Sequence, residues 1–220
     1  MKRLLNTLYV NQPDVYLSLD GDNIVLLKED DVLARLPLHN LESIVTFGYT
    51  GASPALMGYC AERNISLAFF TRSGRFLARV IGESKGNVVL RKRQYLLSED
   101  EAASARIARN FLIGKLFNHK WMIERMIRDY PMRIDSVKFK EVSQQLSAIM
   151  LEMRACEDLE QLRGLEGQAA NSYYRVFDRM ILQQKEDFPF DGRSRRPPLD
   201  PVNAMLSFAY SPLAVETAAA

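Results

Sequence analysis

Gly82-Glu83-Ser84-Lys85-Gly86 divides the chain into two parts whose apolar residues recur with different periods. Before this stretch, apolar residues mostly alternate with polar ones or gather in short β-rich runs, a pattern that favours strands. After it they recur at the spacing of an amphipathic helix, as at Ile107, Phe111 and Leu112. The sequence therefore predicts an α+β protein, in which a small strand-dominated domain with one helix precedes an all-α domain.

The first part contains signals for hairpins and for one helix. Asp20-Gly21-Asp22-Asn23 follows an alternating run and precedes the apolar residues 24–27. Because Gly and Asn tolerate the left-handed backbone of tight turns, this stretch predicts a hairpin. A second hairpin is expected between residues 65–70 and 76–81. Ser53-Pro54 predicts the start of a helix that reaches about Glu62, since Ser is a good N-cap and Pro suits the first turn.

The second part has the pattern of helices interrupted by one long loop. Pro131 predicts that a long helix ends near Tyr130, and further helices are expected over about residues 135–155 and 159–184. The Pro- and Gly-containing stretch 188–198 predicts a loop, and Asp200-Pro201 predicts the start of a last helix. We expect a β-rich domain at residues 1–83, a linker at 84–90 and a helical domain at 91–220.

The composition argues against several classes of protein. No apolar run approaches the ~20 residues that a membrane-spanning helix needs. The basic start of the chain has no apolar stretch behind it, unlike a signal peptide. Cys60 and Cys156 are too far apart to suggest a disulfide framework or a zinc site. We therefore expect a cytoplasmic protein without a membrane partner.

The formal net charge of +2 is unevenly distributed. Residues 87–154 hold thirteen Lys/Arg and eight Asp/Glu, a net charge of +5 (13 − 8). A basic helical segment can bind the phosphates of a nucleic acid, because clustered cations release condensed counterions. The alternative is an ordinary solvated helix face.

Glu166, within Gly164-Leu165-Glu166-Gly167, is the strongest candidate for a chemical role. No Lys or Arg stands three or four residues after it to form a local ion pair. The small residues around it leave room for a ligand, and a carboxylate without a cation is costly to bury. Carboxylate oxygens suit Mg²⁺ or Mn²⁺. The alternative is a solvent-facing glutamate beside glycines that pack against another helix.

Arg193, Arg195 and Arg196 form a second candidate, because guanidinium groups held by neighbouring prolines can pair with phosphate oxygens. The alternative is a solvated surface loop. His39 has no acidic or cysteine partner at ligand spacing, and His119 lies on an expected helix beside Lys120 and Trp121. We interpret both histidines as structural or surface residues. Four aromatic residues could stack on bases or belong to a core: Tyr173, Tyr174, Phe177 and Tyr210.

Three stretches together resemble the CRISPR-associated integrase, the first-numbered Cas protein and the endonuclease of spacer acquisition, in a form similar to subtype I-C. They are residues 50–57 (TGASPALM), 164–174 (GLEGQAANSYY) and 200–210 (DPVNAMLSFAY). The resemblance covers residues 1 to about 210. It implies a β-sandwich domain followed by a helical domain, and a metal-dependent DNA endonuclease and integrase. Such a protein is expected to form a homodimer, to bind the second-numbered Cas protein, and to insert short duplex DNA (prespacers) into the CRISPR array at its repeat.

The resemblance also implies a metal site for Mg²⁺ or Mn²⁺ made of a glutamate, a histidine and a further acidic residue. Glu166 matches the glutamate, but no histidine follows it. After Tyr210 the chain departs from the family, and Pro212 is expected to interrupt the last helix. We therefore expect a C-terminally truncated member that lacks two of three metal ligands and has little activity alone. The alternative is a non-catalytic DNA-binding or assembly module of the adaptation complex.

Overall fold

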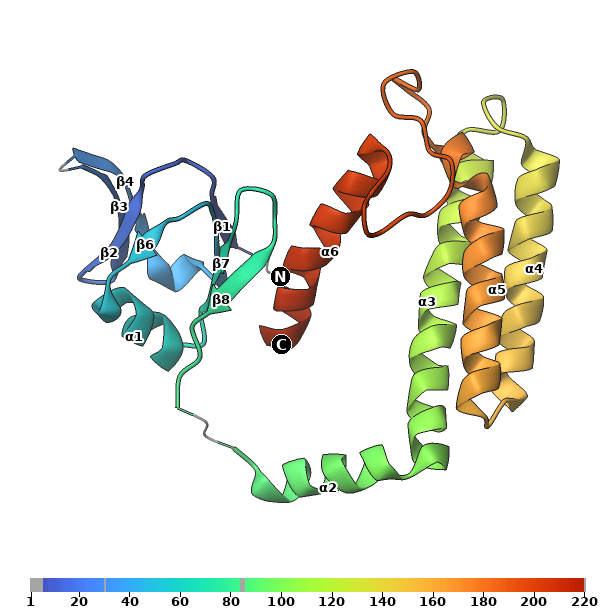
Figure 1. Cartoon of the computed structure of the whole chain (residues 1–220), viewed down its shortest axis with the longest axis horizontal. Helices are drawn as coiled ribbons and strands as arrows, with labels where there is room; N and C mark the ends of the chain where they lie inside the picture. Colours follow the sequence, from blue (N-terminus) through green and yellow to red (C-terminus); the bar gives the residue numbers. More distant parts are fainter. Residues whose placement is uncertain (1–5, 30, 84–85, 220) are drawn as a thin grey trace. The chain divides into compact units, whose positions relative to one another are not determined.

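The computed structural model describes residues 6–29, 31–83 and 86–219. The chain forms two compact units (Figure 1): residues 1–85 with 205–220, and residues 86–204. The first boundary falls inside the linker expected at residues 84–90. Among the described residues, no helix has both the length and the apolar character needed to cross a membrane.

The strand unit contains two four-stranded sheets. The first has the order β1 (Thr7–Val10), β5 (Ser43–Phe47), β7 (Ser66–Phe70) and β8 (Phe76–Arg79); the second has the order β4 (Asp31–Pro37), β3 (Asn23–Lys28), β2 (Tyr16–Asp20) and β6 (Gly51–Ala52). One α-helix, α1 (Pro54–Glu62), and a 3₁₀ turn, η1 (Leu38–Asn40), complete the part before residue 83. The predicted α+β class is confirmed.

The two sheets share one apolar core, as expected for a sandwich. Leu17 and Ile24 from the second sheet and Ile44 and Leu67 from the first are fully buried in it, together with Leu56 of α1. Both predicted hairpins form, as β2–β3 and β7–β8. The predicted cap of α1 is confirmed as well, since the Ser53 hydroxyl accepts a hydrogen bond from the third residue of the helix.

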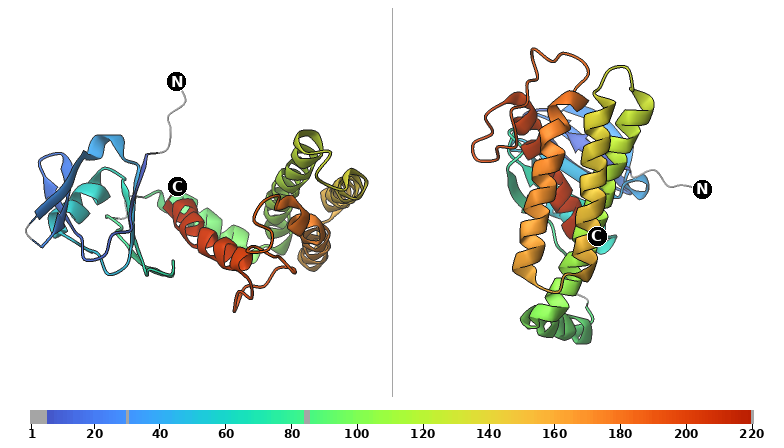
Figure 2. Two further views of the ribbon diagram at one scale, coloured as in Figure 1. Left: turned by 90° about the horizontal axis from the view of Figure 1, so that it is seen from above. Right: turned by 90° about the vertical axis from the view of Figure 1, so that its right-hand side faces the viewer.

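The helical unit is built on three helices that lie side by side (Figure 2), namely α3 (Glu101–Asp129), α4 (Ser136–Ala155) and α5 (Leu159–Phe177). Each begins at an aspartate, Asp100, Asp135 or Asp158, whose carboxylate accepts a backbone N–H bond in the first turn. The buried core between them includes Leu116, Phe139 and Leu146 among others.

Two helix boundaries differ from the expected ones. The segment before Tyr130 is not one helix, because Asp100 caps α3 and separates it from α2 (Val88–Glu99). The helix expected to reach residue 184 ends at Phe177 and continues only as the 3₁₀ turn η2 (Asp178–Met180). Asp178 explains this end, since its carboxylate accepts a hydrogen bond from the Phe190 backbone N–H and pairs with Lys185.

The last helix, α6 (Pro201–Ala219), starts where Asp200-Pro201 predicted but continues through Pro212. The predicted interruption is therefore wrong. Contacts with the strand unit hold the helix on both sides of the proline: the Phe208 ring stacks on Phe47 at 5.3 Å between centroids, and the Ser43 hydroxyl donates to Glu216 over 2.7 Å.

Residues 205–220 therefore belong to the strand unit, which differs from the helical domain expected over 91–220. The physical reason is a small apolar cluster on the first sheet. Val215 packs there with Val45, Ala68 and Phe70 and is 7% exposed. The helical period of residues 201–219 did not indicate which core would bury them.

We expect Val215→Ala to lower the free energy of unfolding of the strand unit by about 1.5 kcal/mol, because it removes two buried methyl groups from this cluster. Urea denaturation measures the change. Leu213→Ala is the matched control on the same helix, since Leu213 is 59% exposed. Equal effects of the two substitutions would contradict the packing of α6 on the sheet.

Candidate DNA-binding site

The position of Glu166 follows from the buried face of α5. Leu162, Leu165 and Ala169 are buried against the neighbouring helices. Glu166 follows Leu165 and lies at the edge of this face, where its side chain is 31% exposed. The carboxylate is therefore partly shielded from water rather than fully solvated.

Glu166 forms an ion pair with Lys115 of α3. No Lys or Arg stands three or four residues after Glu166 on α5, and Arg163, three residues before it, pairs with Glu160. The partner of Glu166 stands 51 residues earlier in the chain and was not predicted from the sequence. Only the packing of α3 against α5 brings the ammonium group to the carboxylate. No local sequence signal marked Lys115.

His119 lies one turn after Lys115 on α3. Its ring stacks on the Tyr173 ring with centroids 4.1 Å apart and planes 12° apart. Burial lowers the pKa of His119, the Lys115 ammonium lowers it further, and the Glu166 carboxylate opposes both effects. The imidazole is therefore neutral at neutral pH, and its Nδ1 is buried without a hydrogen-bond partner among the described residues.

A cavity of about 540 Å³ lies between α5 and the loop that precedes α6. Its lining includes Glu166, Gly167 and Arg175 from α5, and Arg193 and Arg195 from the loop. The structure thus brings the predicted carboxylate and two of the three predicted arginines to one cavity. Arg196 is exposed and does not line it.

The loop is held in place by Asn203, which is completely buried. Its side-chain oxygen accepts hydrogen bonds from Arg193 Nη1 at 2.8 Å and from the Ser194 backbone at 3.0 Å. Its Nδ2 donates to the Gly192 carbonyl at 2.8 Å and to Asp200 at 2.6 Å. Arg193 therefore stabilises the loop. Asn203, which organises these bonds, was not predicted from the sequence as a functional residue.

Aromatic residues attach the other end of the loop to α5. Phe190 is 5% exposed and its ring lies 4.9 Å from Phe177 and 5.9 Å from Tyr174. Phe177, Tyr174 and the buried Tyr173 pack inside the unit. The structure therefore assigns these three to the core rather than to base stacking. Tyr210 is 49% exposed.

The glycines on either side of Glu166 do not pack against another helix. A Cβ at Gly164 or Gly167 would meet no heavy atom within 4 Å. Both occupy a helix interior, where glycine costs about 1 kcal/mol relative to alanine. They leave open space beside the carboxylate, and close helix packing does not require them.

Comparison with known proteins identifies the family. The sequence model of the family described as CRISPR associated protein Cas1 matches residues 8–220. The chain belongs to the Cas1 family. It is 41% identical over 211 residues to CRISPR-associated endonuclease Cas1 1 of Chlorobaculum tepidum, and 42% identical over 215 residues to CRISPR-associated endonuclease Cas1 2 of Rhodospirillum rubrum. Both alignments cover 96% of this chain and 62% of the relative, so the chain spans less than two thirds of their length.

Solved structures show the same fold. Cas1 from Thermotoga maritima has a TM-score of 0.73 at 21% identity, covering 98% of this chain and 64% of that one. A casposase bound to its integration product has a TM-score of 0.76 at 18% identity, covering 96% of this chain and 60% of that one. A chain of a Cas6-RT-Cas1–Cas2 complex has a TM-score of 0.74 at 21% identity, covering all of this chain and 23% of that one.

The divalent metal site that the Cas1 resemblance implies does not fit the donors present around Glu166. Among the residues that the structure describes, no group of three or more His, Cys, Asp or Glu side chains is able to hold a metal ion. Mg²⁺ and Mn²⁺ need several oriented oxygen ligands to replace their waters. Asp178 and Asp191 line the same cavity as Glu166, but they do not form such a group with it. Glu166 is already paired with Lys115, and Asp178 is paired with Lys185.

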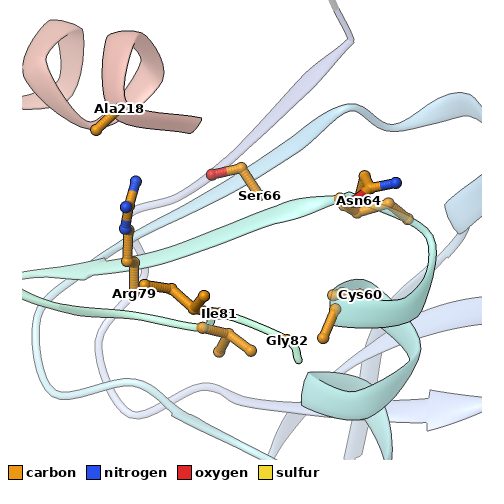
Figure 3. A pocket seen from close by; sticks show the side chains of 10 residues that line it. Cys60, Asn64, Ser66, Arg79, Ile81, Gly82 and Ala218 are labelled. Atoms are coloured by element: carbon orange, nitrogen blue, oxygen red, sulfur yellow. The ribbon is translucent and has the colours of Figure 1, made fainter. Parts of the chain in front are cut away.

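A second cavity, of about 180 Å³, lies within the strand unit of this Cas1 chain beside Cys60. Figure 3 shows Arg79 extending toward Ala218, with Cys60 elsewhere on the pocket wall. Burial raises the pKa of the Cys60 thiol to about 11. The thiol is therefore protonated at neutral pH, and this pocket lacks an activated nucleophile.

We expect Cys60 to resist a thiol reagent such as DTNB in the native protein below pH 9, because only the thiolate attacks and a pKa of about 11 keeps its fraction small. Its reaction rate should rise as the pH approaches that value, or on denaturation. The variant Cys156→Ser isolates the Cys60 signal. Fast native reaction at pH 8 would contradict the protonated, buried thiol.

Proposed function

We propose that this chain binds DNA as part of a Cas1 integrase that acts in CRISPR adaptation, with the cavity between α5 and the basic loop as its contact with the sugar-phosphate backbone. The observation that carries the proposal is the convergence of Glu166, Arg193 and Arg195 on one cavity in a member of the Cas1 family. The DNA would be the duplex prespacer and the CRISPR repeat into which it is inserted.

The chemistry of the cavity supports a phosphate ligand. Arg175 and Arg195 are exposed at its wall, and guanidinium groups pair with phosphate oxygens through two parallel hydrogen bonds. The surplus of Lys and Arg over residues 87–154 extends the positive charge along the same unit. The open backbone at Gly167 leaves space for close approach of a ligand.

The family relation supports further parts of the proposal. One structural neighbour is a chain of a Cas6-RT-Cas1–Cas2 complex, so we include the second-numbered Cas protein, Cas2, among the partners. We also propose a homodimer, a subtype I-C-like assignment and a cytoplasmic location. A monomer in sedimentation velocity at micromolar concentration would argue against the homodimer.

We propose that catalysis requires the complete metal site of the Cas1 family. Metal-dependent cleavage and strand joining need an ion fixed by several ligands, and Glu166 would supply one of them. The second candidate, a non-catalytic DNA-binding or assembly module, is favoured because the described residues contain no group of three or more His, Cys, Asp or Glu side chains that could hold a metal ion. The two candidates share the DNA contact and differ in whether this chain alone performs chemistry.

We expect the double variant Arg195→Gln, Arg196→Gln to weaken binding of a short labelled duplex and to reduce the salt dependence of binding. Each lost phosphate contact should lower the slope of log K against log salt by about 0.9. Fluorescence anisotropy over a salt series measures both quantities. Arg193 is left intact because it supports the loop through Asn203.

The matched control is Arg163→Gln, since Arg163 is an exposed arginine of α5 that pairs with Glu160 and does not line the cavity. It should leave affinity and slope close to those of the unchanged protein. If the double variant bound DNA as well as the control did, the basic loop would be an ordinary solvated loop.

We expect the purified chain to show little or no cleavage of branched DNA in the presence of Mn²⁺, because one ion-paired carboxylate does not hold the ion in a defined place. Gel analysis of the products tests this expectation. Mn²⁺-dependent cleavage that Glu166→Ala abolishes would contradict it and would favour the catalytic candidate.

A further inference from the structure

The ion pair between Lys115 and Glu166 determines the net charge that an approaching cation encounters beside the Glu166 carboxylate. The two side chains come from α3 and α5, and they are 41% and 31% exposed. Neither group is sealed inside the core. An ion from solvent can therefore reach the carboxylate, and the pair can separate without exposing a buried charge.

The groups around the carboxylate already balance its charge. Glu166 carries one negative charge and Lys115 one positive charge, while His119 is neutral because burial lowers its pKa. Arg193 and Arg195 line the loop side of the cavity together with Asp191, and the opposite wall holds Arg175 and Asp178, which is paired with Lys185. A divalent cation approaching Glu166 thus meets an ammonium group in contact with the same carboxylate, and like charges repel at this range.

We propose that Lys115 is a positioning residue whose ammonium group occupies the place of a metal ion at Glu166 and competes with Mn²⁺ for this carboxylate. The pair adds to the shortage of donors as a reason why the residues present do not fit the implied metal site. This inference deepens the proposed function. It rests on the role that the proposed function gives to Glu166 as a metal ligand.

Lys115 also holds the carboxylate in a defined direction. Glu166 has several rotamers available at this half-buried helix edge, and pairing with a residue of α3 selects those that face that helix. Lys115 stands next to Leu116, which is 1% exposed, so its Cα is fixed by the core of the unit. The pair therefore keeps the site ordered while no metal ion is bound.

The test is a titration of the full chain with Mn²⁺ alone, followed by the loss of the free-ion signal in electron paramagnetic resonance. Lys115→Met keeps the length of the side chain and removes its charge. We expect this variant to bind Mn²⁺ about tenfold more tightly than the unchanged chain, a difference of about 1.4 kcal/mol. Lys115→Arg keeps the positive charge and should bind Mn²⁺ as weakly as the unchanged chain.

Two controls separate this effect from a general change of charge. Lys120→Met removes a lysine of the same helix that has no ion pair with Glu166, and it should leave the Mn²⁺ affinity unchanged. The double variant Lys115→Met, Glu166→Gln should lose the gain, because the carboxylate is gone. Thermal unfolding followed by circular dichroism checks each variant, and Lys115→Gln replaces Lys115→Met if the latter does not fold.

An Mn²⁺ affinity that does not rise in either neutral variant would overturn the proposal, and so would a gain that persists without the Glu166 carboxylate. The proposed function fails separately, in the anisotropy experiment with DNA. A chain that binds no DNA but gains Mn²⁺ affinity in Lys115→Met would lose the proposed function and keep the competition at Glu166. The reverse result would keep the DNA site and remove the role of Lys115.

Discussion

The burial of one apolar stripe on α5 determines where the chemical groups of the site lie. Leu162, Leu165 and Ala169 face the core of the helical unit, and successive residues on a helix are about 100° apart. Once these residues are buried, Glu166 must lie at the edge of the stripe, next to α3. The same core buries Leu116, which places Lys115 opposite the carboxylate. Packing thus brings together two charges that the chain separates.

The wall of the cavity depends on a buried polar residue rather than on apolar packing alone. Both the side-chain oxygen and the Nδ2 of Asn203 form hydrogen bonds, so the burial of this side chain does not leave its own polar atoms unpaired. Phe190 fixes the other end of the loop on α5. The arginines consequently divide their tasks: Arg193 supports the loop from within, and Arg195 remains exposed at the cavity.

The fold and the site were accessible from the sequence to different degrees. The change of period, the hairpins and the helix caps rest on neighbouring residues, and the structure has them where they were expected. The break at Asp100, the early end of α5 at Phe177 and the continuation of α6 through Pro212 were missed. The end at Phe177 and the continuation through Pro212 depend on partners distant in the chain, such as Phe190 or Phe47. Motif reasoning singled out Glu166 and the arginines, but it could not find Lys115, which no local spacing connects to them.

By itself the sequence determined the α+β class, the division near residue 85 and the membership of the Cas1 family, because backbone preference, apolar period and motif order are properties of short segments. Only the tertiary structure decided that α6 packs on the strand unit, that the loop meets α5, and that Lys115 neutralises Glu166. Side chains far apart in the chain meet only when cores form, and the energy of their contact depends on that geometry.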